Sequence, residues 1–244
     1  MKRIILTLAA AAALTLATGL PVASSDFTQA TVSCDDGTSF TEVLDADTLA
    51  SLVQSVEAMT LYPAGLSCTV LQAPVVHALG GMASAWPGGG FIVGGGRYLA
   101  PCANGLGFYW LNFAVSAHTE TVNPGAVRGG TLNFTAPGGQ LCIGEGHVTS
   151  KPTCLKINAE QPKPPDGTWF AYMWSHVTQK SDSLTFFPDD FGAGWADNGN
   201  PSQPKMDRVA LDSQSTCPSD GSPDPNGVFS RPIPNGNITI HAAP

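Results

Sequence analysis

The segment FYWLNFAVSA, residues 108–117, alternates apolar with mixed side chains at every second position. Its apolar face consists of Tyr109, Leu111, Phe113, Val115 and Ala117. This period of two predicts a long strand with one face against a core. Strand-like segments follow at residues 131–135, 141–149, 153–158, 168–178, 183–187, 208–211 and 237–241. Turn clusters rich in Gly, Pro and Asn separate them, which predicts a mainly β fold: an antiparallel sandwich or barrel, of which we expect the β-sandwich.

Residues 31–72 have a different pattern. Two strands are predicted at 31–34 and 38–44, joined by the turn at residues 35–37, and a third at 66–71. Between them, one face of an amphipathic helix is formed by Leu49, Leu52, Val53, Val56 and Met59. We expect Asp47 to cap this helix, and Pro63 with Gly65 to end it. The expected architecture is a small N-terminal α+β element over residues 26–80 and a sandwich domain over 81–244.

The first 25 residues resemble a cleaved secretory signal peptide. Lys2 and Arg3 precede an apolar run at residues 4–20, and Ala23-Ser24-Ser25 offers a cleavage point. An uncleaved membrane anchor is the alternative. Removing the leader changes the net charge from −8 to −10, which argues against nucleic acid as a partner. No later stretch is long and apolar enough to span a membrane, so we expect a secreted or extracellular protein.

Six cysteines in an exported chain predict disulfide bonds. No C-x-x-C spacing is present, which argues against a zinc ribbon or a redox pair. Six cysteines allow 15 pairings. The pairing we expect is Cys34–Cys68, Cys142–Cys154 and Cys102–Cys217.

Between Ala58 and Thr119 the chain carries one formal charge, Arg97. The glycines at 88–90 and 94–96 flank a short predicted strand at 91–93, but neither dinucleotide nor phosphate-loop spacing is present. We therefore interpret these glycines as tight turns or as sites of close strand approach. Arg97 either binds a ligand carboxylate or pairs with an acidic residue of the sheet.

Several strings occur in an order that resembles a group of exported bacterial β-sandwich domains. They are CIGEGHVT at 142–149, CLKI at 154–157, DNGNP at 197–201, Asp207, and GNITIH at 236–241. The likeness covers residues 91–241. The resemblance implies a surface-exposed or secreted module without an assigned enzymatic activity. A Pro-rich insertion at 161–166 and the loop at 217–226 depart from the pattern, which puts edge contacts and a ligand pocket in doubt.

Two sets of side chains are candidate binding sites. The first is acidic and amide-rich, and suits Ca²⁺ as a cofactor: Asp189, Asp190, Asp197, Asn198, Asn200 and Asp207. Because Asp and Asn also dominate turns, a network of structural turns is the alternative that we favour. The second set is an aromatic platform for sugars: Trp110, Phe170, Tyr172 and Trp174. Its alternative, also favoured, is that one face of strand 169–174 meets the core and the other meets the N-terminal element.

His118 with Glu120 and His147 with Glu145 are candidate acid–base or metal-ligand pairs. The chain has no H-E-x-x-H or G-x-S-x-G motif. We therefore expect a non-catalytic binding or structural module of the bacterial cell surface or extracellular space, with a polysaccharide or a cell-surface molecule as its partner. The alternative is an extracellular hydrolase that uses one of the two His–Glu pairs.

Overall fold

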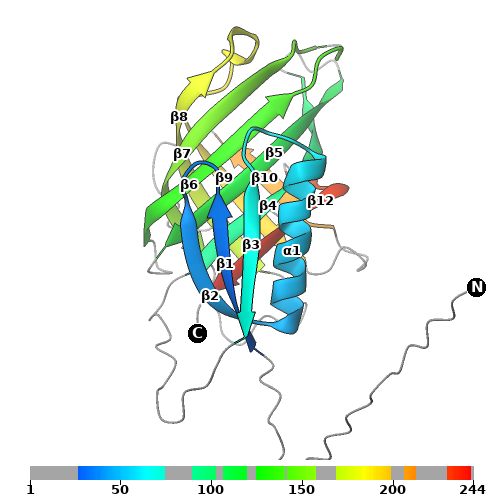
Figure 1. Ribbon diagram of the computed structural model, residues 1–244. Coiled ribbons are helices and arrows are strands. Elements are labelled where there is room, and N and C mark those ends of the chain that lie inside the picture. Colours follow the sequence, from blue (N-terminus) through cyan, green and yellow to red (C-terminus); the bar gives the residue numbers. More distant parts are fainter. Residues whose placement is uncertain are drawn as a thin grey trace, which may run out of the picture.

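The computed structural model describes residues 27–74, 90–102, 107–119, 125–140, 142–157, 169–198, 206–212 and 230–242. These residues form two antiparallel sheets and one α-helix (Figure 1). The predicted fold class, mainly β with a small N-terminal α+β element, is confirmed.

The N-terminal element consists of β1 (Phe27–Cys34), β2 (Ser39–Asp45), α1 (Ala46–Leu61) and β3 (Cys68–Pro74). Its sheet has the order β2-β1-β3, so β1 pairs with both neighbours. The helix begins two residues earlier than predicted, because the Asp45 side chain accepts a hydrogen bond from the Thr48 backbone N–H at 2.8 Å. The prediction of Asp47 as the cap was therefore wrong, and Asp47 lies in the first turn.

The second sheet has nine strands in the order β11-β10-β9-β8-β7-β6-β5-β4-β12. Chain neighbours pair as a meander, and the last strand returns to pair with β4. Its strands are β4 (Gly90–Pro101), β5 (Phe108–Thr119), β6 (Gly125–Ala136), β7 (Gly146–Ile157), β8 (Trp169–Lys180), β9 (Asp190–Asp197), β10 (Arg208–Asp212), β11 (Arg231–Pro232) and β12 (Asn235–Ala242).

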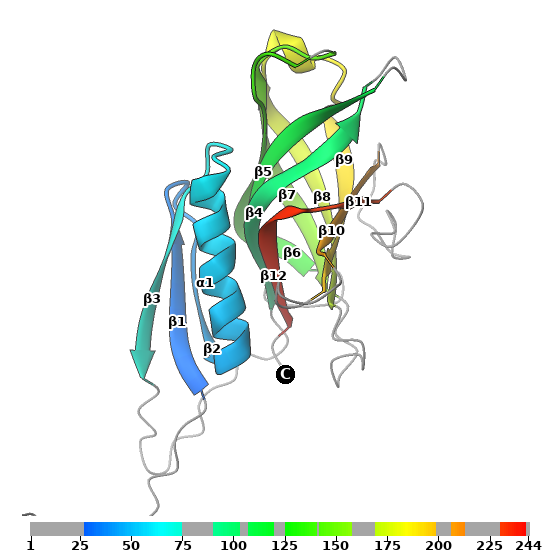
Figure 2. The same cartoon turned by 90° about the vertical axis from the view of Figure 1, so that its right-hand side faces the viewer.

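This sheet folds over a single core, so that its two halves pack face to face as in a sandwich (Figure 2). The Phe113 ring on β5 lies 5.2 Å from the Trp195 ring on β9, and the Phe134 ring on β6 lies 5.9 Å from Phe191. All four side chains are buried. The apolar face predicted for residues 108–117 faces this core.

Four segments differ from the prediction. The two separate strands predicted at 141–149 and 153–158 are one strand, β7, which begins at Gly146. Residues 91–93 belong to a twelve-residue strand that continues through Gly94–Gly96. Residues 183–187, predicted as a strand, lie in a short 3-10 helix (Asp182–Leu184) and the turn after it. Strand β9 was not predicted, because its flanking Asp residues and its two glycines are typical of a loop.

Helix α1 packs on the outer face of β4 and β12 (Figure 2). Glycines in β4 permit this close contact, since a Cβ atom at Gly95 would lie 2.7 Å from the Cα of Met59 in the helix. A Cβ at Gly94 would lie 2.5 Å from the backbone oxygen of Asn237 on β12. For Gly94 and Gly95 the interpretation as sites of close approach is confirmed. Gly88 and Gly89 lie outside the described residues.

A polar contact lies within the same interface. The Ser55 hydroxyl on α1 lies 2.8 Å from the Thr239 hydroxyl on β12 and accepts a hydrogen bond from the Asn237 side-chain amide at 2.8 Å. All three residues are buried. Because buried polar groups are costly unless they are paired, these bonds fix the register of the helix on the sheet.

The expected Cys34–Cys68 disulfide is confirmed. The expected pairs Cys142–Cys154 and Cys102–Cys217 were wrong, because Cys102 pairs with Cys142. Strands β4 and β6 run in the same direction, so Cys102 after β4 and Cys142 after β6 come to the same end of the sheet. Cys154 is also disulfide-bonded. Within the described ranges, no helix is long and apolar enough to cross a membrane.

We expect Gly95→Ala to destabilise the protein by about 1–3 kcal/mol, because the new methyl group meets helix backbone rather than a flexible side chain. Chemical unfolding measures this loss. Gly138→Ala is the matched control, since its methyl group meets only the Glu145 side chain, whose Oε2 atom is the nearest at 3.2 Å. Equal unfolding midpoints for the two variants would contradict the proposed role of Gly95.

Candidate functional site

A polar cleft of about 460 Å³ lies between the β1–β2 turn and the outer face of strands β5 to β8. The turn contributes Asp36, Gly37, Thr38 and Ser39, and the sheet contributes His118, Arg128, Gly129, Gly130, Thr131, Thr149, Ser150, Lys151 and Thr178. None of these side chains is a large apolar one. The cleft is therefore lined by hydroxyls, charged groups and backbone.

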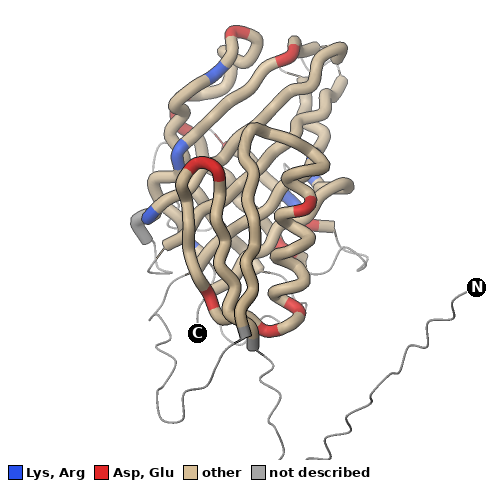
Figure 3. The backbone as a smooth tube through the Cα atoms, in the orientation of Figure 1, with Lys and Arg blue, Asp and Glu red and all other residues tan. Residues whose placement is uncertain are grey.

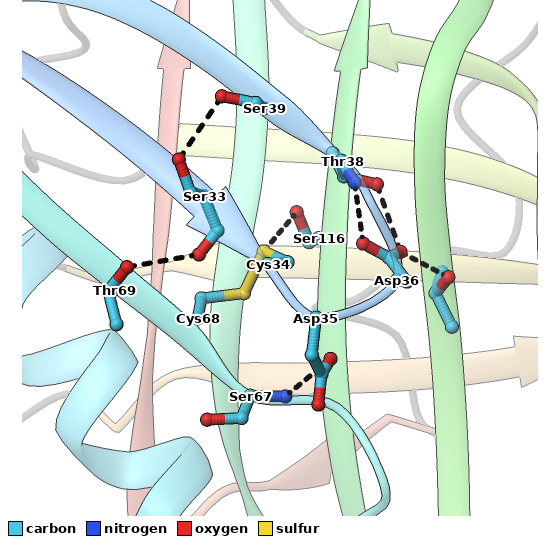
Figure 4. The surroundings of a disulfide bond; sticks show 11 residues. Ser33, Cys34, Asp35, Asp36, Thr38, Ser39, Ser67, Cys68, Thr69 and Ser116 are labelled. Atoms are coloured by element: carbon cyan, nitrogen blue, oxygen red, sulfur yellow. Dashed lines mark hydrogen bonds between the residues drawn. A yellow bond between two sulfur atoms is a disulfide. The ribbon is translucent and has the colours of Figure 1, made fainter.

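Asp36 holds the turn against the sheet (Figure 4). Its carboxylate accepts hydrogen bonds from the Thr38 backbone N–H at 2.8 Å and from the Thr38 hydroxyl at 2.9 Å. It also accepts one from the Thr131 hydroxyl on β6. Gly37 has a φ of 87°, the left-handed conformation that favours glycine. The Cys34–Cys68 disulfide lies at the base of this turn, so the wall of the cleft is covalently anchored to β3.

The floor of the cleft is a break in the sheet. Strands β6 and β7 pair at Ala126 with Cys154 and again at Leu132 with Ser150. Residues 127–131 of β6 therefore lie opposite only residues 151–153 of β7, and one of these, Pro152, has no N–H to donate. Irregularities of this kind redirect side chains and interrupt the ladder of backbone hydrogen bonds, and they are frequent beside functional sites.

Charged groups surround this break. Arg128 and Lys151 are both exposed at the cleft. The His118 imidazole lies 3.5 Å from the Glu42 carboxylate and stacks on the Phe40 ring at 5.1 Å. Figure 3 shows how sparse charged residues are on the strands, and shows the acidic β1–β2 turn that forms the wall. The cleft thus brings together cationic and anionic groups in a chain of which only 12% is charged.

The predicted Ca²⁺ ligands do not form one site. Asp189 binds Lys180 at 2.6 Å and Asp190 binds His176 at 2.8 Å, both at the start of β9. Asp197, Asn198 and Asp207 lie at its other end, roughly 23 Å away at the usual rise of a strand. Asn200 lies outside the described residues. Nowhere in the described part of the chain do three or more His, Cys, Asp or Glu side chains form a group suited to a metal.

Asp197 and Asp207 instead bind the free edge of β12. The Asp197 carboxylate accepts the Ile240 backbone N–H at 3.0 Å, and Asp207 accepts the Ile238 N–H at 2.9 Å. Asp207 also accepts the Asn198 N–H at 3.0 Å. Both carboxylates are buried. We call this pair, Asp197 and Asp207, the edge clasp. Burial and the nearby Asp197 carboxylate raise the pKa of Asp207 to about 8.

The predicted aromatic platform is divided as well. Trp110 lies on β5, which is separated from β8 by β7 and β6 in the sheet. The Arg97 guanidinium lies over its ring, 4.6 Å from the ring centroid. On β8, Phe170 and Tyr172 are partly exposed and Trp174 is buried. The opposite face of β8 meets the core, as we favoured, but the apolar contacts of the large sheet with the N-terminal element come from β4 and β5. Arg97, which also lies 5.3 Å from the Tyr62 ring, stacks on aromatic rings rather than pairing with an acid.

The histidines of both candidate His–Glu pairs contact other side chains. His118 contacts Glu42, while Glu120 lies outside the described residues. The His147 imidazole lies 2.9 Å from the Ser181 hydroxyl, and Glu145 is exposed. Nothing in the sequence indicated that Glu42 would contact His118. The two residues are far apart in the chain, and they meet only because β2 lies against β5.

The remaining cleft residues were also missed. Thr131, Thr149 and Thr178 are ordinary strand residues in the sequence, and only the pairing of three strands places them beside the β1–β2 turn. The turn itself was predicted from its Asp-Asp-Gly residues, but its position against the large sheet was not. Comparisons with family models, curated proteins and solved structures gave no match.

We expect the edge clasp to make stability depend on pH. The pKa of Asp207 is higher in the folded chain than the ordinary value of 3.8, so its contribution is complete below about pH 4 and is lost as pH rises through about 8. Melting temperatures from pH 6 to pH 9 should fall in the wild type. The fall should be smaller in Asp207→Asn, which cannot ionise, although that variant loses one backbone hydrogen bond, about 1 kcal/mol. Parallel profiles would show that Asp207 does not titrate in this range.

We expect Ca²⁺ to have no effect on stability. The carboxylates of Asp189 and Asp190 are paired with Lys180 and His176, and those of the edge clasp accept backbone N–H groups. Melting curves in millimolar Ca²⁺ and in chelator should coincide. A higher melting temperature in Ca²⁺ would restore the metal-site hypothesis.

Proposed function

We propose that this chain is an exported, non-catalytic binding module of the bacterial cell surface or extracellular space. The leader-like first 25 residues support export, and the disulfide bonds accord with an oxidising compartment. The polar cleft is the binding surface in this proposal. The observation that carries it is the break between β6 and β7. At this break the two strands stop pairing, and their backbone lies beside hydroxyl and charged side chains.

The hydrolase alternative has less support. Hydrolysis of a polymer requires a general acid or base that reaches the scissile bond together with a second catalytic group. His118 is the one histidine in the lining of the cleft, and it is stacked on Phe40 beside a largely buried Glu42. His147 is bound to Ser181 on another part of the surface. A binding role requires no such constellation, and the cleft already offers donors and acceptors on both walls.

Binding to bacterial cells tests the proposal. The mature chain, residues 26–244, is incubated with washed bacterial cells and sedimented. We expect the wild type to sediment with the cells and Gly129→Gln to remain in solution, because the new side chain fills the cleft. A Cβ atom at Gly129 makes only ordinary contacts with Thr38, at 3.7 Å, so the variant should still fold.

Gly138→Gln is the matched control, since Gly138 is exposed in a turn outside the cleft. It should sediment as the wild type does. Failure of the wild type to sediment, or equal loss in both variants, would overturn the proposal. Mass spectrometry of the chain secreted with its leader should show cleavage near residue 25, and an intact leader would overturn the export part.

A further inference from the structure

We infer that the cleft binds an anionic saccharide, a sugar unit that carries a carboxylate or a phosphate. This inference rests on the proposed binding function and adds the chemical class of the ligand. Three observations point to it: the two exposed cations, the hydroxyl lining, and the size of the cleft.

The cations indicate an anionic group on the ligand. Arg128 on β6 and Lys151 on β7 lie on either side of the break in the ladder. A guanidinium can grip a carboxylate or phosphate with two parallel hydrogen bonds, and an ammonium adds a point charge. The acidic residue of the lining is Asp36. Its carboxylate accepts hydrogen bonds from Thr38 and Thr131, so these donors partly compensate its negative charge.

The hydroxyls indicate a polyhydroxylated ligand. Threonine and serine side chains come from four separate segments of the lining: Thr38, Ser39, Thr131, Thr149, Ser150 and Thr178. Four of them, Thr38, Thr131, Ser150 and Thr178, donate their proton within the protein and keep lone pairs that can accept a hydrogen bond from a sugar hydroxyl. A fatty or aromatic ligand would find no large apolar side chain among the lining residues.

The size of the cleft limits the ligand. Its volume of about 460 Å³ lies within the usual range for small-molecule sites, roughly 300–1,000 Å³. It is open on one side, between the turn and the sheet, so a short segment or the end of a glycan can enter while the rest of the polymer stays in solvent.

Calorimetric titration tests this inference. The probes are an oligogalacturonate, its methyl ester, glucose 6-phosphate and inorganic phosphate. We expect the oligogalacturonate or the sugar phosphate to bind, and to bind more weakly as salt is raised, since exposed charges are screened. The methyl ester keeps the hydroxyls and removes the charge, so it should bind at least about tenfold more weakly, the size of one charge-assisted hydrogen bond. The tighter of the two anionic probes identifies carboxylate or phosphate as the recognised group.

Matched variants locate the site. Arg128→Gln and Lys151→Gln should each weaken binding by about tenfold or more. Lys156→Gln removes the same charge from the same strand, outside the cleft lining, and should bind as the wild type does. Equal losses in all three variants would mean that net charge rather than the cleft holds the ligand, and would overturn the inference.

Other outcomes separate this inference from the proposed function. Equal affinity for the methyl ester would show that charge is not recognised. Equal affinity for inorganic phosphate would show a simple anion site without sugar recognition. If no probe binds while Gly129→Gln still abolishes sedimentation with cells, the ligand class is wrong and the binding function stands. If cell binding is also absent, the function itself fails.

Discussion

The large sheet is closed at the edge of β12, where two buried carboxylates accept hydrogen bonds from the backbone. A strand at a sheet edge presents backbone N–H groups that need partners, and β12 pairs on only one side, with β4. Among the strands that the structure describes, none covers its other side. The carboxylates of Asp197 and Asp207 take the place of that strand by accepting the N–H groups of Ile240 and Ile238. Because these two acids belong to β9 and to the segment before β10, their bonds also hold the two halves of the large sheet together.

The same geometry explains three of the sequence strings singled out above. Asp197 and Asn198 begin the DNGNP string, Asp207 follows it, and β12 carries the GNITIH string. The structure brings all three together at the edge clasp, although 39 residues separate Asp197 from Gly236 in the chain. Asn237 from the last string reaches Ser55 on the helix. These strings therefore have a structural role, in closing the sheet and in docking the helix, and the cleft lies elsewhere.

Much of the fold could be predicted because its signals are local. The alternation at 108–117 was sufficient for β5, and the spacing from Leu49 to Met59 was sufficient for α1. Strand β9 was missed because Gly192 and Gly194 are typical of turns. Their role becomes visible only in the sheet, where they lie opposite Trp174 and Tyr172 and leave room for those rings. Because residues 190–197 were interpreted as a loop, the acidic and amide residues at its two ends were expected to lie close together and were grouped as one candidate Ca²⁺ site.

The cleft could not be predicted for the same physical reason. Its wall depends on Asp36 reaching Thr131, a contact across 95 residues, and its floor depends on a mismatch in length between two paired strands. Strand mismatch has no local sequence signature beyond Pro152. Yet such a break has a chemical consequence, because backbone groups that leave the ladder need other hydrogen-bonding partners. The turn that Asp36 anchors covers one side of this break only. The Ser150 hydroxyl satisfies one of these backbone groups, the Leu132 carbonyl. The open side of the cleft exposes the remainder of the break to solvent, where a sugar can take the place of water as a hydrogen-bonding partner.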